Sequence, residues 1–222
     1  MTQPPTSPVT VIWDFNGTLI DDLQACLDAL NAILRAHRLP PLSREDYRRR
    51  FDFPVASFYH SLGMAPATPF DWEALAESFH LRYLFSKHLR LQPGARECVS
   101  AFREGRLRQG VLSALEQGLL EMQLQQFGLA EGMDFVLGSS NYEGASKAKA
   151  AERLALRGPV VLIGDTLHDA EVARAQGWQC LLCAAGHQTP ERLACAGYPV
   201  VESLREVTVA RVQALCAEGA RG

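Results

Sequence analysis

The chain of 222 residues has no long hydrophobic run and no excess of positive charge. Its longest apolar stretches are about six residues, as at 180–185, whereas a membrane-spanning helix needs about 20. The first ten residues have no basic region followed by an apolar one, so we expect no secretory signal. The formal net charge is −3, which disfavours a strong electrostatic attraction to nucleic acid. These absences predict a cytoplasmic protein with no membrane and no nucleic-acid partner.

Cysteines are few and scattered, and only Cys180 and Cys183 have a CxxC spacing. The segment that contains them is typical of a buried strand, where positions i and i+3 point to opposite faces. We therefore expect these two thiols to pack as small hydrophobic groups rather than to share a metal ion.

Short apolar segments alternate with helical stretches along most of the chain. Several of these segments are nearly continuous in Val, Ile and Leu, as in strands that are covered on both faces. The predicted strands are 9–15, 109–113, 135–138, 160–165, 178–183 and 199–202. The predicted helices are 94–104, 116–126, 147–156, 169–176, 190–196 and 204–218. This alternation predicts an α/β fold, a Rossmann-like core with a parallel sheet and right-handed crossovers.

Residues 23–90 break the alternation and contain no convincing strand. Apolar residues recur at helical spacing in 22–38 and in 70–87. A helical block inserted after the first strand indicates a cap, residues 23–90, on a core made of 1–22 plus 91–222.

Polar residues that can handle phosphate stand at the ends of the predicted elements. Asp14 and Asp165 end strands, Asp169 follows four positions later, Ser113 ends a strand, and Lys147 begins a helix. In a parallel sheet, ligands bind beyond the carboxyl ends of the strands. Clustered carboxylates repel one another and need a cation, and Mg²⁺ suits oxygen ligands beside a phosphate. A carboxylate can also attack phosphorus, while a hydroxyl and an ammonium hold the phosphoryl oxygens.

In their order, the motifs DxNGTL(x)D, a strand-ending serine, a helix-starting lysine and GDTxxD resemble the haloacid-dehalogenase-superfamily phosphatases. The similarity covers the whole chain, and the cap and the segment AAGHQTPERL resemble phosphoglycolate-phosphatase-like members. It implies a Mg²⁺-dependent phosphomonoester hydrolase that acts on a small phosphorylated metabolite through an aspartyl phosphate.

The resemblance also implies roles for individual residues. Asp14 would be the nucleophile, and Mg²⁺ would be held by Asp14, the backbone carbonyl of Asn16, Asp165 and Asp169. The phosphoryl group would be bound by Ser113 and Lys147, with Lys149 a rival for the lysine role. Thr18, in the turn with Gly17, would contribute to the substrate site.

Position 16 departs from the family pattern, which has an aspartate there as general acid/base. The amide of Asn16 cannot donate and retrieve a proton, and such catalysis typically contributes about 10²–10⁴-fold. Four interpretations stay open: a native asparagine with specialised turnover, an engineered substitution, a proton relay through His168 or His187, or partial deamidation at Asn16-Gly17. Sequence reasoning alone predicts that Asn16→Asp raises the hydrolysis of aryl phosphates at least about tenfold.

A different class of function also stays open, a non-catalytic or weakly active phosphate-binding regulatory protein. Dehalogenase chemistry needs no metal, so the paired carboxylates of Asp165 and Asp169 argue against it. Phosphonate cleavage would need a lysine in the cap, and Lys87 lies near the end of the cap. In the cap, the arginine run 48–50, with Arg49 as the candidate, either binds a distal anionic group of the substrate or forms a solvated helix end. The sequence does not indicate an oligomeric state.

Overall fold

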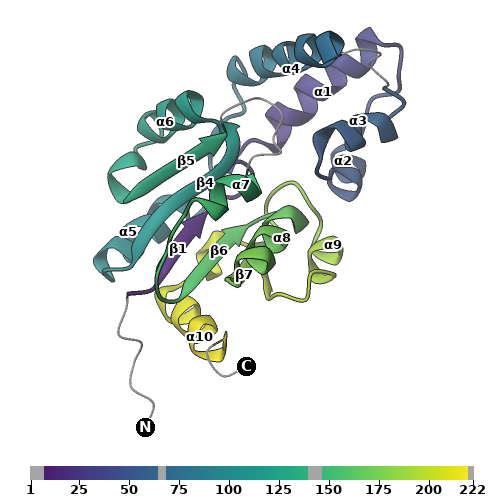
Figure 1. Ribbon diagram of the computed structural model, residues 1–222. Helices are drawn as coiled ribbons and strands as arrows, with labels where there is room; N and C mark the ends of the chain where they lie inside the picture. The colour runs from purple at the N-terminus through teal and green to yellow at the C-terminus, as the bar shows by residue number, and fades with distance from the viewer. Residues whose placement is uncertain (1–7, 65–68, 140–146, 220–222) are drawn as a thin grey trace.

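A parallel sheet of six strands forms the centre of the computed structural model, which describes residues 8–64, 69–139 and 147–219 (Figure 1). The strand order is β5-β4-β1-β6-β7-β8, and all neighbouring strands are parallel. The strands are β1 (Thr10–Trp13), β4 (Arg108–Glu116), β5 (Phe135–Ser139), β6 (Val160–Gly164), β7 (Gln179–Cys183) and β8 (Val200–Val201). Each corresponds to a predicted strand, and the predicted α/β fold is confirmed.

Helices cover both faces of this sheet, because successive strand residues point to opposite sides. Val11 and Trp13 of β1 belong to one buried cluster, and Ile12 between them belongs to another. The first face packs against α5 (Ala95–Glu104), α6 (Gln117–Gln126) and α10 (Val209–Gly219). The second packs against α7 (Lys147–Glu152), α8 (Leu167–Gln176) and α9 (Pro190–Ala194). Two short 3-10 helices, η1 (Ala130–Gly132) and η2 (Leu204–Glu206), pack against the first face.

Cys180 and Cys183 lie on opposite faces of β7, as the CxxC spacing predicted. Cys180 belongs to the second cluster and Cys183 to the first, and both are fully buried and free. Their thiols therefore pack as hydrophobic groups in separate parts of the core.

The expected single helix at 204–218 is wrong, because the chain is divided there into η2 and α10. Val207 is extended, and Thr208 starts the second helix by accepting a hydrogen bond from the backbone N–H of Arg211 at 3.2 Å. The helix expected at 147–156 is also shorter and ends at Glu152.

The region 23–90 forms a separate helical layer at one end of the sheet (Figure 1). Its helices are α1 (Leu23–Ala36), α2 (Arg44–Arg50), α3 (Val55–Ser61) and α4 (Pro69–Leu84), and we call these four the cap helices. They enclose a third buried cluster of their own. The chain enters this layer through β2 (Ile20–Asp21) and leaves it through β3 (Arg90–Leu91), which pair antiparallel. Among the described residues, no helix is long and apolar enough to cross a membrane.

Candidate active site

Asp14 and Asp165 stand side by side beyond the carboxyl edge of the sheet. Their strands are neighbours, with Trp13 in register with Ile163, and the backbone N–H of Asp14 donates to the carbonyl of Ile163 at 2.8 Å. Each aspartate directly follows the last residues of a fully buried strand, so its side chain emerges at the edge where ligands bind to parallel sheets.

Lys147 connects this pair to a third carboxylate. Its Nζ lies 2.6 Å from Oδ1 of Asp14 and also contacts Oδ1 of Asp169. Carboxylate oxygens of Asp14, Asp165 and Asp169 all lie within 4.8 Å of one another. Lys147 is 3% exposed, whereas Lys149 is exposed. Of the two lysines weighed from the sequence, the structure brings Lys147 to the carboxylates.

Asp169 divides its two oxygens between the site and the start of α8. Its Oδ2 accepts hydrogen bonds from the backbone N–H and the hydroxyl of Thr166, at 3.0 and 2.7 Å. Its Oδ1 faces Lys147. The residue therefore caps the helix and belongs to the carboxylate cluster at the same time.

The charges of this cluster are not balanced by the protein alone. Three carboxylates and one ammonium leave a formal charge of −2 in a buried site. Burial raises the pKa of Asp14 well above its ordinary value, and the charges of Asp169 and Asp165 add to this against the opposing effect of Lys147. Burial, with the charge of Asp169, also raises the pKa of Asp165. In Asp169, burial is outweighed by Lys147, which lowers the pKa.

This imbalance and the donor set fit Mg²⁺. The ligands on offer are hard carboxylate oxygens, and a divalent cation would bring the formal charge of the cluster to zero. Gly17 leaves room beside them: its φ is +78°, and a Cβ there would lie 2.3 Å from Oδ2 of Asp165. Asp14, Asp165 and Asp169 are the residues that can hold the ion, and the Asn16 carbonyl stays a prediction from the sequence.

Thr18 and Ser113 are both buried but contact different partners. The Thr18 hydroxyl donates to Oδ1 of Asp165 at 2.8 Å, and so orients that carboxylate. The Ser113 hydroxyl accepts the backbone N–H of Leu115 at 3.1 Å. Strand β4 continues past the expected end at Ser113 to Glu116, with a register shift after Leu112. Ser113 therefore lies within β4, next to the strand that carries Asp14.

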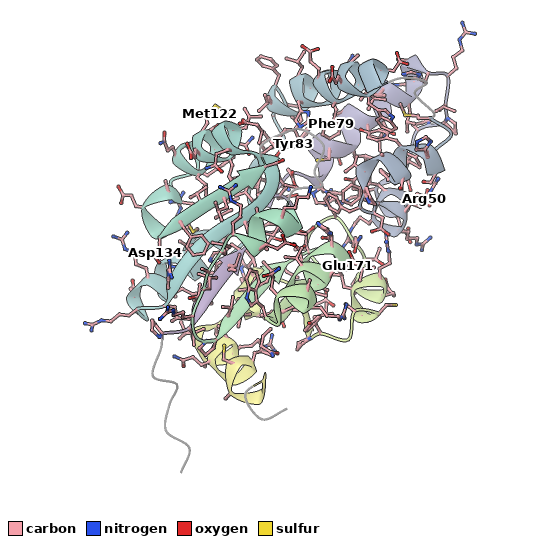
Figure 2. All side chains as sticks on the ribbon, in the orientation of Figure 1. Arg50, Phe79, Tyr83, Met122, Asp134 and Glu171 are labelled. Carbon is pink, nitrogen blue, oxygen red and sulfur yellow. The ribbon has the colours of Figure 1, made fainter. Side chains whose placement is uncertain are left out.

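Asn16 faces the cap through two hydrogen bonds of its side-chain amide. Its Nδ2 donates to Oδ2 of Asp22 at 2.8 Å and to the hydroxyl of Tyr83 at 2.7 Å. Tyr83 lies near the end of α4 (Figure 2) and donates to the same oxygen of Asp22 at 3.0 Å. Asp22 is fully buried. The amide at position 16 is thus fixed by two groups, one of them from the cap.

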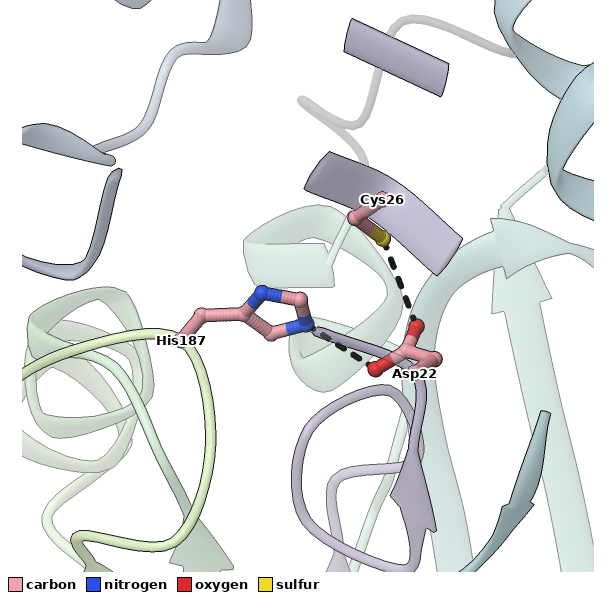
Figure 3. Close-up of side chains that lie close together, drawn as sticks. All are labelled: Asp22, Cys26 and His187. Carbon is pink, nitrogen blue, oxygen red and sulfur yellow. Dashed lines mark hydrogen bonds and ion pairs between the residues drawn. The ribbon is translucent and has the colours of Figure 1, made fainter. Parts of the chain in front are cut away.

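His187 contacts the other carboxylate oxygen of Asp22 (Figure 3). Its Nε2 lies 3.1 Å from Oδ1 of Asp22, its Nδ1 lies 3.1 Å from the Tyr47 hydroxyl, and its backbone N–H donates to Oδ2 of Asp165 at 2.6 Å. Burial favours the neutral imidazole, but Asp22 outweighs it and raises the pKa of His187 to about 9. For Asp22 itself, His187 likewise outweighs burial and lowers the pKa.

His168, the other histidine considered as a relay, has different neighbours. Its ring centroid lies 4.8 Å from that of Phe53, with the two rings tilted by 31°, and its Nδ1 lies 3.4 Å from a carboxylate oxygen of Glu171. Of the two histidines, only His187 contacts both Asp22 and Asp165.

The arginine run at 48–50 divides between the core and the surface. Arg48 donates to the carbonyls of Ala184, Gly186 and Gln188, at 2.6, 2.9 and 2.8 Å. Arg49 is exposed and forms an ion pair with Glu45 one turn earlier on the same helix. The structure therefore does not bring Arg49 to the carboxylates, and the arginine of this run whose side chain contacts the 184–188 loop is Arg48.

Sequence reasoning missed Asp22, Tyr47, Tyr83 and Arg48. Asp22 could have been noticed as a second acid directly after Asp21 at the start of an apolar helix. The two tyrosines carry no local signal, because each reaches the site only through the packing of the cap helices.

A comparison of the sequence with family patterns agrees with this geometry. The chain belongs to the family of haloacid dehalogenase-like hydrolases, whose pattern matches residues 11–183. The expectation that it is a hydrolase of this family is thereby confirmed.

The individual relatives have low sequence identity to this chain. The chain is 24% identical over 194 residues to a phosphoglycolate phosphatase of Synechococcus elongatus, covering 84% of this chain and 88% of that one. It is 28% identical over 189 residues to a phosphoglycolate phosphatase of Caulobacter vibrioides, covering 80% of each. Among solved structures, a HAD hydrolase of Entamoeba histolytica has a TM-score of 0.76 at 19% identity, covering 94% of this chain and 99% of that one. At that identity, the structural similarity supports the fold alone.

Proposed function

We propose that this protein is a Mg²⁺-dependent phosphomonoesterase that transfers the phosphoryl group of a small phosphate ester to Asp14 and then to water. The observation that carries the proposal is the buried cluster of Asp14, Asp165 and Asp169 around Lys147, at the carboxyl edge of the sheet. The relatives named phosphoglycolate phosphatase support a small phosphorylated acid as the class of substrate.

The chain's own residues divide the work of the first step. One carboxylate oxygen of Asp14 attacks phosphorus, and the bond to the ester oxygen breaks, which leaves an aspartyl phosphate. Lys147, 2.6 Å from Asp14 Oδ1, and Ser113 hold the phosphoryl oxygens. When bound, Mg²⁺ neutralises charge that develops on these oxygens. Water then attacks the aspartyl phosphate and releases inorganic phosphate.

The amide at position 16 determines which class of phosphate ester is hydrolysed fastest. Its amide cannot protonate the leaving oxygen. Esters whose leaving groups need no proton, such as aryl phosphates, are therefore expected to react faster than alkyl esters.

We also infer that the cap helices must move to admit substrate. Asp14 is 7% exposed, while Arg48 and Tyr83 hold the cap against the core and the nucleophile loop. Residues 23–90 would then act as the cap, opening for entry and closing to exclude water during the reaction.

A second candidate function is phosphate binding without turnover, which the amide at position 16 favours. Such a protein would keep the carboxylate cluster and Lys147, and would bind phosphate or beryllofluoride without releasing phosphate from any ester. The two functions therefore differ in one observable, catalytic release.

The test is phosphate release from a panel of alkyl and aryl phosphates, with Mg²⁺ and with EDTA. We expect release that requires Mg²⁺, is lost in Asp14→Asn and is unchanged in Asp28→Asn, an exposed acid on α1 that serves as the matched control. Beryllofluoride binding with no release from any ester would instead support the binding protein.

A further inference from the structure

The carboxylate of Asp22 contacts four hydrogen-bonding groups on its two oxygens, from three segments of the chain. Oδ1 accepts the backbone N–H of Gly17 at 2.8 Å and lies 3.1 Å from Nε2 of His187. Oδ2 accepts the amide of Asn16 at 2.8 Å and the hydroxyl of Tyr83 at 3.0 Å. A fully buried carboxylate with this set of donors is a fixed point from which other side chains are oriented.

Asp22, Cys26 and His187 also offer an oxygen, a sulfur and a nitrogen close together (Figure 3). The thiol of Cys26 lies 3.6 Å from Oδ2 of Asp22, within reach as a further weak donor. Because the oxygens of Asp22 already accept donors from the protein, a metal ion would have to displace them. The arrangement fits a hydrogen-bond network better than a second metal centre.

This network specifies which side chain can stand at position 16. The amide nitrogen of Asn16 has two hydrogens, and both are used, toward Asp22 and toward Tyr83. A carboxylate at position 16 would have no hydrogen for either bond. It would instead place two acids about 2.8 Å apart in a buried site, where like charges disfavour each other.

We propose that Asp22 is a positioning residue of this site, which fixes the side chain of Asn16, and that positions 16 and 22 require one amide and one carboxylate. The consequence for turnover rests on the proposed function, whereas the pairing itself rests on the contacts. Through Gly17 and Tyr83, the same carboxylate also ties the loop after Asp14 to helix α4.

The contact between Asn16 and Asp22 reverses the expectation for Asn16→Asp that the sequence alone gives. This single substitution places two carboxylates opposite each other, so we expect it to lower the stability of the protein rather than to raise its activity. The exchange Asn16→Asp with Asp22→Asn restores an amide opposite a carboxylate and keeps the total charge of the pair.

The test compares the melting temperatures of the full-length wild type, N16D, D22N and N16D/D22N. Asp21 supplies the matched control, because D21N removes the same charge one residue away, from an acid that pairs with Arg90 instead. We expect N16D to melt about 5 °C or more below the wild type, N16D/D22N to melt above N16D although it lacks the contact of Asp22 with His187, and N16D/D21N to melt no higher than N16D. An N16D as stable as the wild type, or equal recovery by D21N, would overturn the pairing.

The comparison still decides if N16D does not fold. In that case, the proposal is supported if N16D/D22N is recovered as a folded protein and N16D/D21N is not. It is overturned if D22N folds and N16D/D22N does not.

Turnover of an aryl phosphate separates positioning from mere stabilisation. Measured well below its melting temperature, D22N is expected to lose about tenfold in kcat while D21N does not. An unchanged kcat in folded D22N would overturn the positioning role. No turnover in the wild type would overturn the proposed function instead, and the melting temperatures would still decide the pairing.

Discussion

The Nζ atom of Lys147 lies 2.6 Å from Oδ1 of Asp14, although 133 positions separate the two residues in the chain. Both side chains are buried, and the same ammonium contacts Asp169. Burial alone would lower the pKa of Lys147, but the two carboxylates raise it, so the ammonium keeps its charge beside the proposed nucleophile. A phosphoryl group that reaches Asp14 therefore meets a fixed positive charge.

Lys147→Ala should abolish most of the activity. Removing the charge beside the reacting group is expected to lower kcat/KM at least about 10²-fold. It also leaves buried carboxylates without their partner, which costs roughly 3–5 kcal/mol in the free energy of unfolding without Mg²⁺. The exposed Lys149→Ala is the control, expected to match the wild type in kinetics and in urea unfolding. Similar losses in both variants would argue against the assignment of Lys147.

Mg²⁺ should stabilise the folded protein by neutralising the carboxylate cluster. At a concentration of about 100 times the Kd, binding contributes about 2.7 kcal/mol, which corresponds to a rise in Tm of roughly 5–10 °C. Asp165→Asn removes one ligand and should abolish most of this shift, whereas Asp28→Asn should keep it. Thermal unfolding with Mg²⁺ and with EDTA measures the difference. A shift that persists in Asp165→Asn would place the ion elsewhere.

Stability without Mg²⁺ should fall between neutral and alkaline pH because of the contact of His187 with Asp22. The pKa of His187 is raised from an ordinary 6.5 to about 9, so the folded state holds this proton more tightly than the unfolded chain. The contribution, roughly 3 kcal/mol, is complete below pH 6.5 and is lost as the pH rises to 9. Urea unfolding across this range, in EDTA, measures the slope. His187→Gln should remove it, and an equal slope in that variant would assign the effect to another group.

Arg48→Ala should loosen the cap, whereas Arg49→Ala should not. Arg48 makes three hydrogen bonds to the carbonyls of the 184–188 loop, whereas the side chain of Arg49 is exposed and forms an ion pair with Glu45. We expect Arg48→Ala to cost about 1–3 kcal/mol in stability and to change kcat and KM together, and Arg49→Ala to stay within about 0.5 kcal/mol. Urea unfolding and steady-state kinetics of both variants provide the check. A larger effect from Arg49 would restore the expectation drawn from the sequence.

The strands and the residues at their ends could be predicted because both depend on local sequence. Asp14 and Asp165 directly follow apolar runs, and the carboxyl ends of parallel strands meet at one edge, so their meeting follows from the topology. Lys147 could be predicted for a similar reason, since it begins the helix that precedes β6.

The contacts of the cap could not be predicted, because they depend on how separate helices pack. Asp22 contacts Tyr83, which is 61 positions away in the chain, and His187, which is 165 positions away. No local sequence pattern predicts either contact. The sequence of the arginine run at 48–50 likewise does not predict which of the three side chains contacts the core. Tyr47 is buried and Arg48 follows it toward the 184–188 loop, while the next position on α2 turns outward.

The central claim is that Asp14 carries the phosphoryl group, and trapping of that group tests it most directly. The enzyme is mixed with an aryl phosphate and Mg²⁺, quenched in acid, reduced with borohydride and digested, and the peptide containing residue 14 is examined by mass spectrometry. The account predicts that an aspartyl phosphate at Asp14 is reduced to homoserine, with no such product in Asp14→Asn. Release of phosphate by the wild type without any modification at Asp14, or with the modification at Asp165 or Asp169, would contradict it.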